Sequence, residues 1–247
     1  GLDRGALKAG SFPEVYWGST LEDSTSVSAL AAVLAGTAGA DGLPAVLQPN
    51  YILSSLTWEP GGPGAARDGE WTARDLPQVP PGYARRGLWS AVRQAIAAGV
   101  WQPEFHGRWH YDPARRREGA LATPAAREAA RRQILLFPGS ESAYELGGWR
   151  STADLAVELD GSLHVFASLF GRPARAVIAP DYHWDDRCEK LWLTRGLSTI
   201  QAKRGQRQPA YAGLAGRARK VGERTLARQL RRDRVYLERN CYFEPVQ

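Results

Sequence analysis

The order of apolar segments along this chain predicts an α/β protein with a largely parallel sheet. Short β-type runs alternate with amphipathic helical segments, and such connections place helices between parallel strands through right-handed crossovers. The 247 residues, 43% of them hydrophobic, suffice for one sizeable core, so we expect a single domain over residues 1–247. These observations fit either a barrel or an open α/β sheet.

Capping residues and apolar spacing predict the helices. The first begins at Ser24 or Thr25, since either hydroxyl can cap it, and ends near Gly36. Its apolar face consists of Val27, Leu30, Val33 and Leu34. The later helices, bounded by capping residues, glycine or proline, are predicted at about 83–98, 124–134, 154–159, 184–195 and 215–231.

Short strand-like runs between turn-forming residues or helices predict the strands, and the one at 104–105 is expected because it follows the helix stop at Gly99. The predicted strands lie at 45–47, 104–105, 175–179, 197–201 and 235–243. Residues 59–82 are rich in proline, glycine and charge, and we expect them to form a long surface loop.

The chain is basic, with a formal net charge of +6 and arginine runs near 115–117 and 228–234. Basic chains attract nucleic acid and other anionic surfaces. Here the basic residues are spread over several elements without a nucleic-acid motif, so we expect no nucleic-acid partner. No apolar run reaches the 18 or more residues of a membrane span. Nothing in the sequence indicates an oligomeric state.

The ends and the cysteines of the chain bear on its compartment. A chain without methionine does not begin at its own initiator, so we expect a processed, trimmed or partial product. If a secretory leader has been removed, the protein is extracellular or belongs to the cell envelope; otherwise it is cytoplasmic. Cys188 and Cys241 lack metal-type spacing, and each is expected to be a buried apolar residue.

The sharpest chemical signal is a pair of histidines. His106 and His110 are two of only four histidines in the chain, and they stand four residues apart around Gly107. On a helical turn such residues share a face, so both imidazoles could reach one ion. Neutral imidazole suits Zn²⁺ and related divalent metals, although a site needs at least a third ligand. The alternative is a pair of ordinary surface or core histidines.

Polar residues follow several predicted strands, and strand ends converge at one mouth of a barrel. Mixed aromatic, amide and carboxylate groups suit a carbohydrate, whose ring faces stack while its hydroxyls form hydrogen bonds. For the acidic members the alternative is a role at the N-terminus of the next helix. The candidates are Glu22, Asp23, Asn50, His106, Arg108, His110, Asp181, Tyr182, His183 and Trp184.

The segment 104–110 resembles the H-x-x-x-H metal motif of the polysaccharide deacetylase superfamily, the NodB-like carbohydrate esterases. More narrowly, it resembles a bacterial branch with a P-x-F-H-G-R-x-H signature. The segments 17–23, 170–184 and 236–245 also resemble that branch.

The resemblance implies a distorted (β/α)7-type barrel whose first and last strands lie outside these 247 residues. It implies an enzyme that uses a divalent metal, usually zinc, to remove acetyl groups from a sugar polymer or oligosaccharide. His106 and His110 match the two metal histidines, and Asp181 with Tyr182 matches a substrate-side position. The superfamily's catalytic histidine would lie beyond Gln247.

The superfamily's first-strand aspartate pair has no counterpart here, so the third ligand stays open among Asp23, Asp112 and Asp181. We expect Asp181, Arg108 and Asp23 to be catalytic, with Arg108 as a substrate or oxyanion contact. The expected substrate-binding residues are Glu22, Asn50, Tyr182, His183 and Trp184. Two alternatives remain. One is a metal-independent glycoside hydrolase with two carboxylates about 5 to 9 Å apart. The other is a non-catalytic sugar-binding relative.

Overall fold

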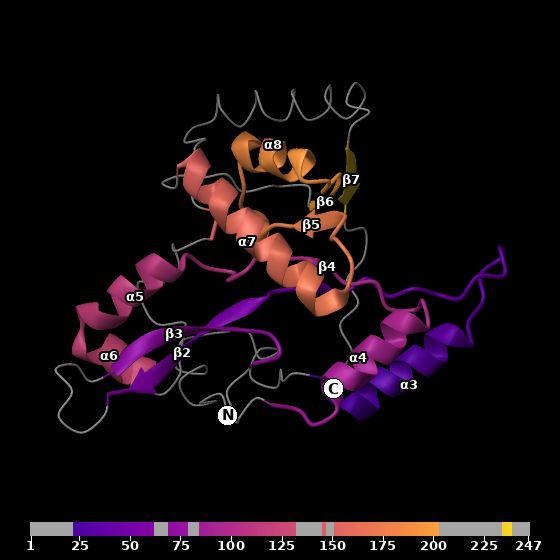
Figure 1. The fold of residues 1–247 in the computed structure, drawn as a ribbon, viewed down its shortest axis with the longest axis horizontal. Coiled ribbons are helices and arrows are strands. Elements are labelled where there is room, and N and C mark those ends of the chain that lie inside the picture. The colour runs from indigo at the N-terminus through magenta and orange to yellow at the C-terminus, as the bar shows by residue number, and fades with distance from the viewer. Residues whose placement is uncertain are drawn as a thin grey trace. The chain divides into compact units, whose positions relative to one another are not determined.

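The computed structural model describes residues 22–61, 69–78, 84–131, 145–146, 151–202 and 234–238 (Figure 1). By its internal contacts the chain divides into two compact units. The first unit comprises Gly1–Pro49, Leu53–Pro103 and Asp112–Ala143. The second unit comprises Asn50–Ile52, Glu104–Tyr111 and Tyr144–Gln247.

The second unit is built on a parallel sheet. Its described strands, in their order across the sheet, are β1 (Asn50–Tyr51), β4 (Glu104–Phe105), β5 (Ala176–Ile178), β6 (Thr199–Ala202) and β7 (Val235–Glu238). Every neighbouring pair is parallel. The predicted α/β class with a parallel sheet is therefore confirmed, whereas closure into a barrel stays a prediction.

Helices α7 (Thr152–Phe170) and α8 (Asp186–Thr194) cover one face of this sheet, and α7 crosses the strands in Figure 1. The ring centroids of Tyr51 on β1 and Phe170 on α7 are 4.8 Å apart. A small pocket of about 20 Å³ lies between the strands, both helices and residues 145–146. By strand register, the helix-facing row holds Tyr51, Phe105, Val177 and Ile200, and the opposite row holds Asn50, Glu104, Ala176 and Thr199.

Both helices begin at a polar cap. The Ser151 hydroxyl accepts the Asp154 N–H at 3.1 Å, and α7 ends at Gly171, whose φ is +68°. Asp185 caps α8 by accepting the N–H groups of Arg187 and Cys188 at 2.9 and 3.2 Å. The predicted helix at 154–159 is too short. Its apolar spacing continues through buried residues to Phe170, so packing extends the helix by three turns.

An ion pair joins α7 to α8 at the surface. Arg195 donates from Nε and Nη2 to the two oxygens of Asp160 at 2.5 and 2.8 Å. The side chain of Asp160 is 59% exposed, so the pair is screened and contributes at most about 1 kcal/mol.

The Asp160 pair makes the stability depend slightly on pH. The hydrogen bond from Arg195 lowers the pKa of Asp160 below its ordinary value of 3.8, so the contribution is present above that pH and disappears as the pH falls through the lowered pKa. We expect Asp160→Asn to reduce the free energy of unfolding by about 0.5 kcal/mol at pH 7. The difference from the unaltered protein should shrink below pH 3.8, as measured by urea unfolding at several pH values. A difference that persists unchanged in acid would contradict this assignment.

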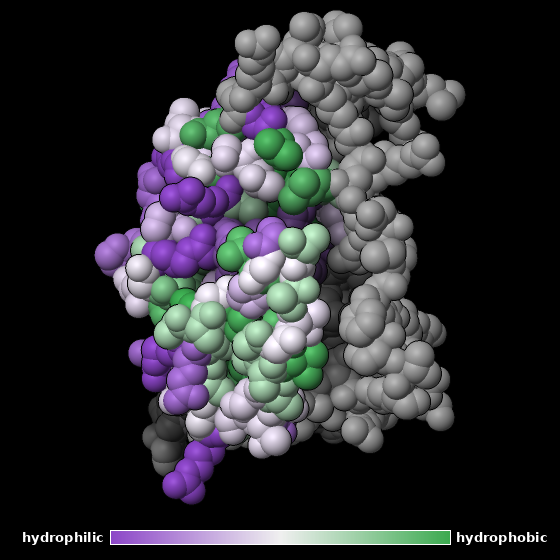
Figure 2. Space-filling model, turned by 90° about the vertical axis from the view of Figure 1, so that its right-hand side faces the viewer, coloured by the Kyte–Doolittle hydropathy of each residue, from purple (hydrophilic) through white to green (hydrophobic). Residues whose placement is uncertain are grey.

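The first unit contains the packed helices α3 (Ser24–Ala35) and α4 (Leu88–Ala97). Their core holds Val27, Leu88, Ala91, Val92, Ala95, Val100 and Trp101. Two members of the predicted apolar face of the first helix face solvent instead, because Leu30 and Val33 are 39% and 64% exposed. Figure 2 views the side that carries the segment after α3 and shows apolar residues reaching the surface there.

Part of the predicted loop at 59–82 is a strand. β2 (Ser54–Pro60) and β3 (Gly69–Asp75) form an antiparallel pair, and the rings of Trp58 and Trp71 meet edge to face at 5.4 Å. Trp71 is the one buried residue of β3, and the strand lies among proline and glycine residues that favour a loop. Residues 62–68 and 79–83 lie outside the description.

Other predictions in the first unit need smaller corrections. The run 45–47 is not a strand, although Leu47 makes an isolated bridge with Trp101. α4 begins at Leu88 rather than near 83. The helix predicted at 124–134 is present as α6 (Pro124–Arg131), and residues 132–134 lie outside the described part of the chain. Helix α5 (Pro113–Ala122) was not predicted, although Asp112 caps it and proline stands at its first position.

In the second unit, Cys188 is buried as predicted, whereas Cys241 lies outside the described residues. The predicted helix at 215–231 and the end of the strand predicted at 235–243 lie outside them too. Within the described residues, none of the helices combines the length and apolar character that a membrane span requires.

Candidate site at the carboxyl ends of β4 and β5

His106 directly follows β4 and is held on both sides. Its backbone N–H donates to the carbonyl of Tyr51 at 3.0 Å, and its ring Nδ1 lies 2.9 Å from the carbonyl oxygen of Ile178 at the end of β5. A carbonyl can only accept, so Nδ1 carries the proton and Nε2 keeps its lone pair. Burial lowers the pKa of His106 to about 4, so the ring is neutral at neutral pH. A neutral imidazole with its other nitrogen fixed by a backbone carbonyl is the usual state of a metal-binding histidine.

His110 brings its ring next to that of His106. The ring centroids are 5.4 Å apart and the planes are nearly perpendicular, at 80°. The spacing of the two residues suggested that they share a helical turn, but the backbone between them is not helical. Gly107 has a φ of +93° and His110 a φ of +66°, so a folded loop brings the rings together. The predicted pairing of the two imidazoles is present, by a different backbone route.

Glu145 holds this loop, and the sequence reasoning missed it. Its carboxylate is 2% exposed and accepts three consecutive backbone N–H groups, from Arg108 at 2.7 Å, Trp109 at 3.1 Å and His110 at 2.9 Å. Burial raises the pKa of Glu145 to about 7, against the lowering effect of the three donors. Glu145 stands 35 residues after His110, and no local spacing links the two.

Glu158 on α7 anchors the same loop through its side chains. Its Oε1 accepts the indole N–H of Trp109 at 2.8 Å and lies 3.6 Å from Nη1 of Arg108. The guanidinium carbon of Arg108 is 5.0 Å from the Trp109 ring centroid, within the range of a cation–π contact. Arg108 therefore fastens the loop to α7, and its role as a substrate or oxyanion contact stays a prediction.

Asp181 lies in the short turn η2 (Pro180–Tyr182) that follows β5. Its exposed carboxylate is close enough to His106 for its charge to raise that ring's pKa, against the larger effect of burial. Asp181 and Tyr182 have φ values of +53° and +55°. Together with His110, they are the described non-glycine residues with positive φ. Such backbone strain costs on the order of 1–3 kcal/mol per residue and collects at functional sites.

Asn50 on β1 and Gln201 on β6 form a reciprocal amide pair. Asn50 Nδ2 donates to Gln201 Oε1 at 3.1 Å, and Gln201 Nε2 donates to Asn50 Oδ1 at 2.9 Å. Two strands lie between β1 and β6, which in a flat sheet would separate them by roughly 14 Å. These side chains cannot bridge that distance, so the sheet is curved and its face opposite α7 and α8 is concave. Strand alternation places His106 on this concave face as well.

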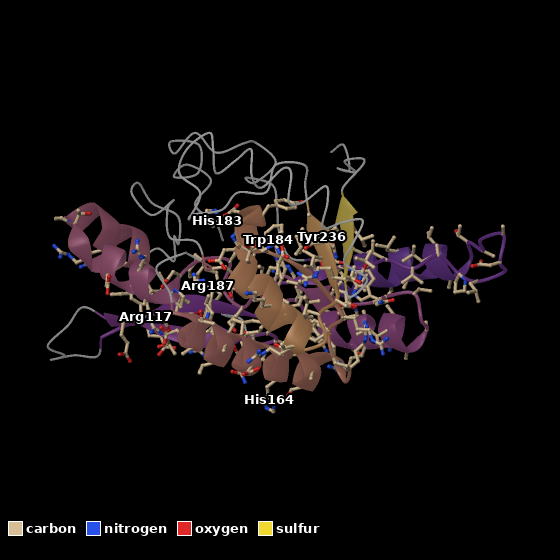
Figure 3. The ribbon with its side chains drawn as sticks, turned by 90° about the horizontal axis from the view of Figure 1, so that it is seen from above. Arg117, His164, His183, Trp184, Arg187 and Tyr236 are labelled. Carbon is tan, nitrogen blue, oxygen red and sulfur yellow. The ribbon has the colours of Figure 1, made fainter. Side chains whose placement is uncertain are left out.

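Two further predicted residues in the second unit are buried. Trp184 is fully buried, donates its indole N–H to Glu189 at 2.9 Å and packs 5.9 Å from the Trp192 ring. It therefore offers no surface to a sugar, and we leave it out of the proposed site. His183 is 8% exposed and precedes it (Figure 3). His164, by contrast, is exposed and points away from α7 in the same view.

The remaining acidic candidates belong to the first unit. Glu22 is exposed, and Asp23 caps α3 by accepting the Ser26 N–H at 2.7 Å. Asp112 caps α5 by accepting the N–H groups of Ala114 and Arg115 at 3.0 and 3.1 Å. The alternative of a role at a helix N-terminus thus accounts for Asp23. Of the three candidates for a third ligand, Asp181 is the one in the same unit as the histidines.

The side chains near His106 supply part of a donor set for a divalent metal. Among the described residues, no group of three or more histidine, cysteine, aspartate or glutamate side chains is arranged to hold an ion. The two imidazole rings are close enough to bind one ion. His106 is also neutral, and its Nε2 carries a lone pair that can bind a metal. Asp181 is the nearby carboxylate that could join them, since its charge acts on His106.

Comparison with known proteins gives weak similarities. No protein-family model and no curated protein matches the chain. Two solved structures are similar to part of it: IcaB from Ammonifex degensii, at 14% identity and a TM-score of 0.32, and the BpsB deacetylase domain from Bordetella bronchiseptica, at 18% identity and a TM-score of 0.30. Each match covers 55% of this chain and about half of the other chain, 48% and 49% respectively. At these values the similarity assigns neither fold nor function.

Proposed function

We propose that this chain is a metal-dependent hydrolase of the polysaccharide deacetylase type, which removes acetyl groups from a sugar polymer or oligosaccharide. The observation that carries the proposal is the His106–His110 pair, with ring centroids 5.4 Å apart and Nδ1 of His106 bound to the Ile178 carbonyl. His106 and His110 would hold a divalent ion, Zn²⁺ first, with Asp181 as the candidate third ligand. A bound ion supplies Lewis-acid polarisation of an acetyl carbonyl and lowers the pKa of bound water.

The neighbouring residues have the chemistry to orient a sugar. Asn50 and Gln201 use one donor and one acceptor each in their mutual pair, which leaves a second N–H and a second lone pair on each amide. Tyr182 is half-buried beside Asp181 and combines an apolar ring with a hydroxyl. If Asp181 is not a ligand, its exposed carboxylate is the candidate general base of the second unit.

We also propose that the sheet belongs to a (β/α) barrel. The described strands are parallel and follow one another in sequence order across the sheet, as the strands of a (β/α) barrel do. The curvature required by the Asn50–Gln201 pair favours closure over a flat open sheet. The site would then lie at the carboxyl ends of the strands, where barrel enzymes place their catalytic residues.

The proposal is tested by acetate release from acetylated oligosaccharides with zinc-loaded protein. We expect activity in the unaltered chain and a loss of about 100-fold or more in His106→Ala and in His110→Ala, because each variant removes a ligand. His164→Ala, at an exposed histidine on α7, is the matched control and should retain full activity.

Other outcomes would support the alternatives. Cleavage of glycosidic bonds without acetate release would favour the carboxylate-pair hydrolase. Binding of the oligosaccharide without either reaction would favour the sugar-binding relative.

A further inference from the structure

Three consecutive backbone N–H groups in the histidine loop converge on one buried carboxylate. Oε1 of Glu145 accepts from Arg108, and Oε2 accepts from both Trp109 and His110, all between 2.7 and 3.1 Å. Successive N–H groups that point into one concavity form a nest, which is an anion-binding arrangement of the backbone. Here the anion is supplied by the chain itself, from a segment 35 residues further on.

The loop has a shape that its own sequence does not favour. His110 has a φ of +66°, which is uncommon for a residue with a side chain, and its N–H is one of the three that Glu145 accepts. Strained backbone of this kind persists only where the surroundings over-determine it. The direction of the His110 ring depends on this conformation, because the φ angle sets the orientation of the Cα–Cβ bond.

Gly107 makes room for the carboxylate. A Cβ placed on Gly107 would lie 2.4 Å from Oε2 of Glu145 and 3.0 Å from Cγ of Pro180. Its φ of +93° is also a conformation that residues with side chains rarely adopt. Glycine at this position is therefore explained by the approach of Glu145 as well as by the turn.

We propose that Glu145 is a positioning residue for the metal-binding histidines: its carboxylate holds the backbone of Arg108, Trp109 and His110 in the shape that sets the His110 ring against His106. The inference rests on the proposed function in one respect, namely that these two rings bind a metal. Outer partners of metal ligands typically change metal affinity by about 10- to 100-fold when they are replaced.

The test is the Zn²⁺ affinity of the metal-free full chain, measured by competition with a chromophoric chelator. Glu145→Gln places an NH₂ donor where one oxygen accepted N–H groups, so we expect its affinity to fall about 10- to 100-fold. Gly107→Ala should have the same effect, because its Cβ displaces the carboxylate. Glu145→Asp keeps both oxygens one methylene further back and should be intermediate.

Glu189→Gln is the matched control. Glu189 is also a buried glutamate of the second unit, at 6% exposure, and it accepts hydrogen bonds from Trp184, Arg234 and Tyr236. This variant should lose stability and keep its Zn²⁺ affinity, so it separates positioning from a general loss of folding.

Amide hydrogen exchange of metal-free protein gives a second readout. The N–H groups of Arg108, Trp109 and His110 should exchange faster in Glu145→Gln than in the unaltered chain, with no such change in Glu189→Gln. If the unaltered chain binds Zn²⁺ and both Glu145→Gln and Gly107→Ala bind it equally well, the inference is overturned and the proposed function stands. If the unaltered chain binds no Zn²⁺, the proposed function fails, and the exchange rates alone decide whether Glu145 holds the loop.

Discussion

Replacing Glu104 with alanine should lower the free energy of unfolding by about 3–5 kcal/mol, the range expected when one partner of a buried ion pair is removed. Glu104 is fully buried on β4. Its Oε2 accepts the N–H groups of Arg175 and Ala176 at 2.7 and 2.8 Å, and its Oε1 pairs with Arg172 at 3.1 Å. Alanine would leave two backbone donors at the start of β5 without their acceptor and a partly buried guanidinium without its carboxylate.

Glu104→Gln is the matched variant for this prediction. Its carbonyl oxygen can keep the two backbone N–H groups, and only the pairing with Arg172, whose side chain is 26% exposed, is weakened. We expect a loss of about 1–2 kcal/mol, since Arg172 can reach solvent. The measurement is chemical unfolding followed by circular dichroism. A loss below about 1 kcal/mol in the alanine variant, the size of a single ordinary hydrogen bond, would contradict the role given to Glu104.

Replacing Glu189 with alanine should have an effect of similar size, about 3–5 kcal/mol, and should loosen β7 in particular. Glu189 on α8 accepts the indole N–H of Trp184 at 2.9 Å, a guanidinium N–H of Arg234 at 3.0 Å and the hydroxyl of Tyr236 at 2.7 Å. The Arg234 side chain is only 9% exposed, so its charge would lose its buried counter-charge. Trp184 and Tyr236 are labelled next to each other in Figure 3, and Glu189 accepts a hydrogen bond from each of them.

Tyr236→Phe is the control for the Glu189 prediction. It removes one of the three donors and leaves the ion pair intact, so we expect a loss of about 1 kcal/mol. Burial and the hydrogen bond to Glu189 raise the pKa of the Tyr236 phenol, so this hydroxyl stays a donor through neutral pH. Unfolding measurements, together with hydrogen exchange of residues 235–238, test both variants. Unchanged exchange of β7 in Glu189→Ala would show that Glu189 does not hold that strand.

The parts of the fold that could be predicted are those with a strong local pattern. The strand at 104–105 follows the helix stop at Gly99, and the strand at 175–179 is a mainly apolar run before Pro180. α8 lies within two residues of its prediction because Asp185 and Gly196 bound it. The strand β3 could not be predicted, because Trp71 is its only large apolar residue and the strand lies in a segment rich in proline and glycine. The position of β1 was missed for a related reason. Only two residues pair, and the apolar run just before them makes no more than an isolated bridge.

Some features of the candidate site could be predicted from the sequence, and others could not. The histidine pair could be predicted, because its spacing and the glycine between the two residues are visible in seven letters of sequence. Glu145 could not, since its three contacts join segments 35 to 37 residues apart. The Asn50–Gln201 pair spans 151 residues and depends on the curvature of the sheet, which no local pattern encodes. Trp184 lies in the core, and sequence alone does not distinguish an aromatic residue that faces a sugar from one that is buried.

The most direct test of the proposed metal site is the metal content of the purified chain, measured by elemental mass spectrometry beside His106→Ala and His164→Ala. We expect near-stoichiometric zinc or a similar divalent ion in the unaltered chain and in His164→Ala, and its loss in His106→Ala. No bound metal in the unaltered chain after reconstitution, or equal metal in all three proteins, would contradict it.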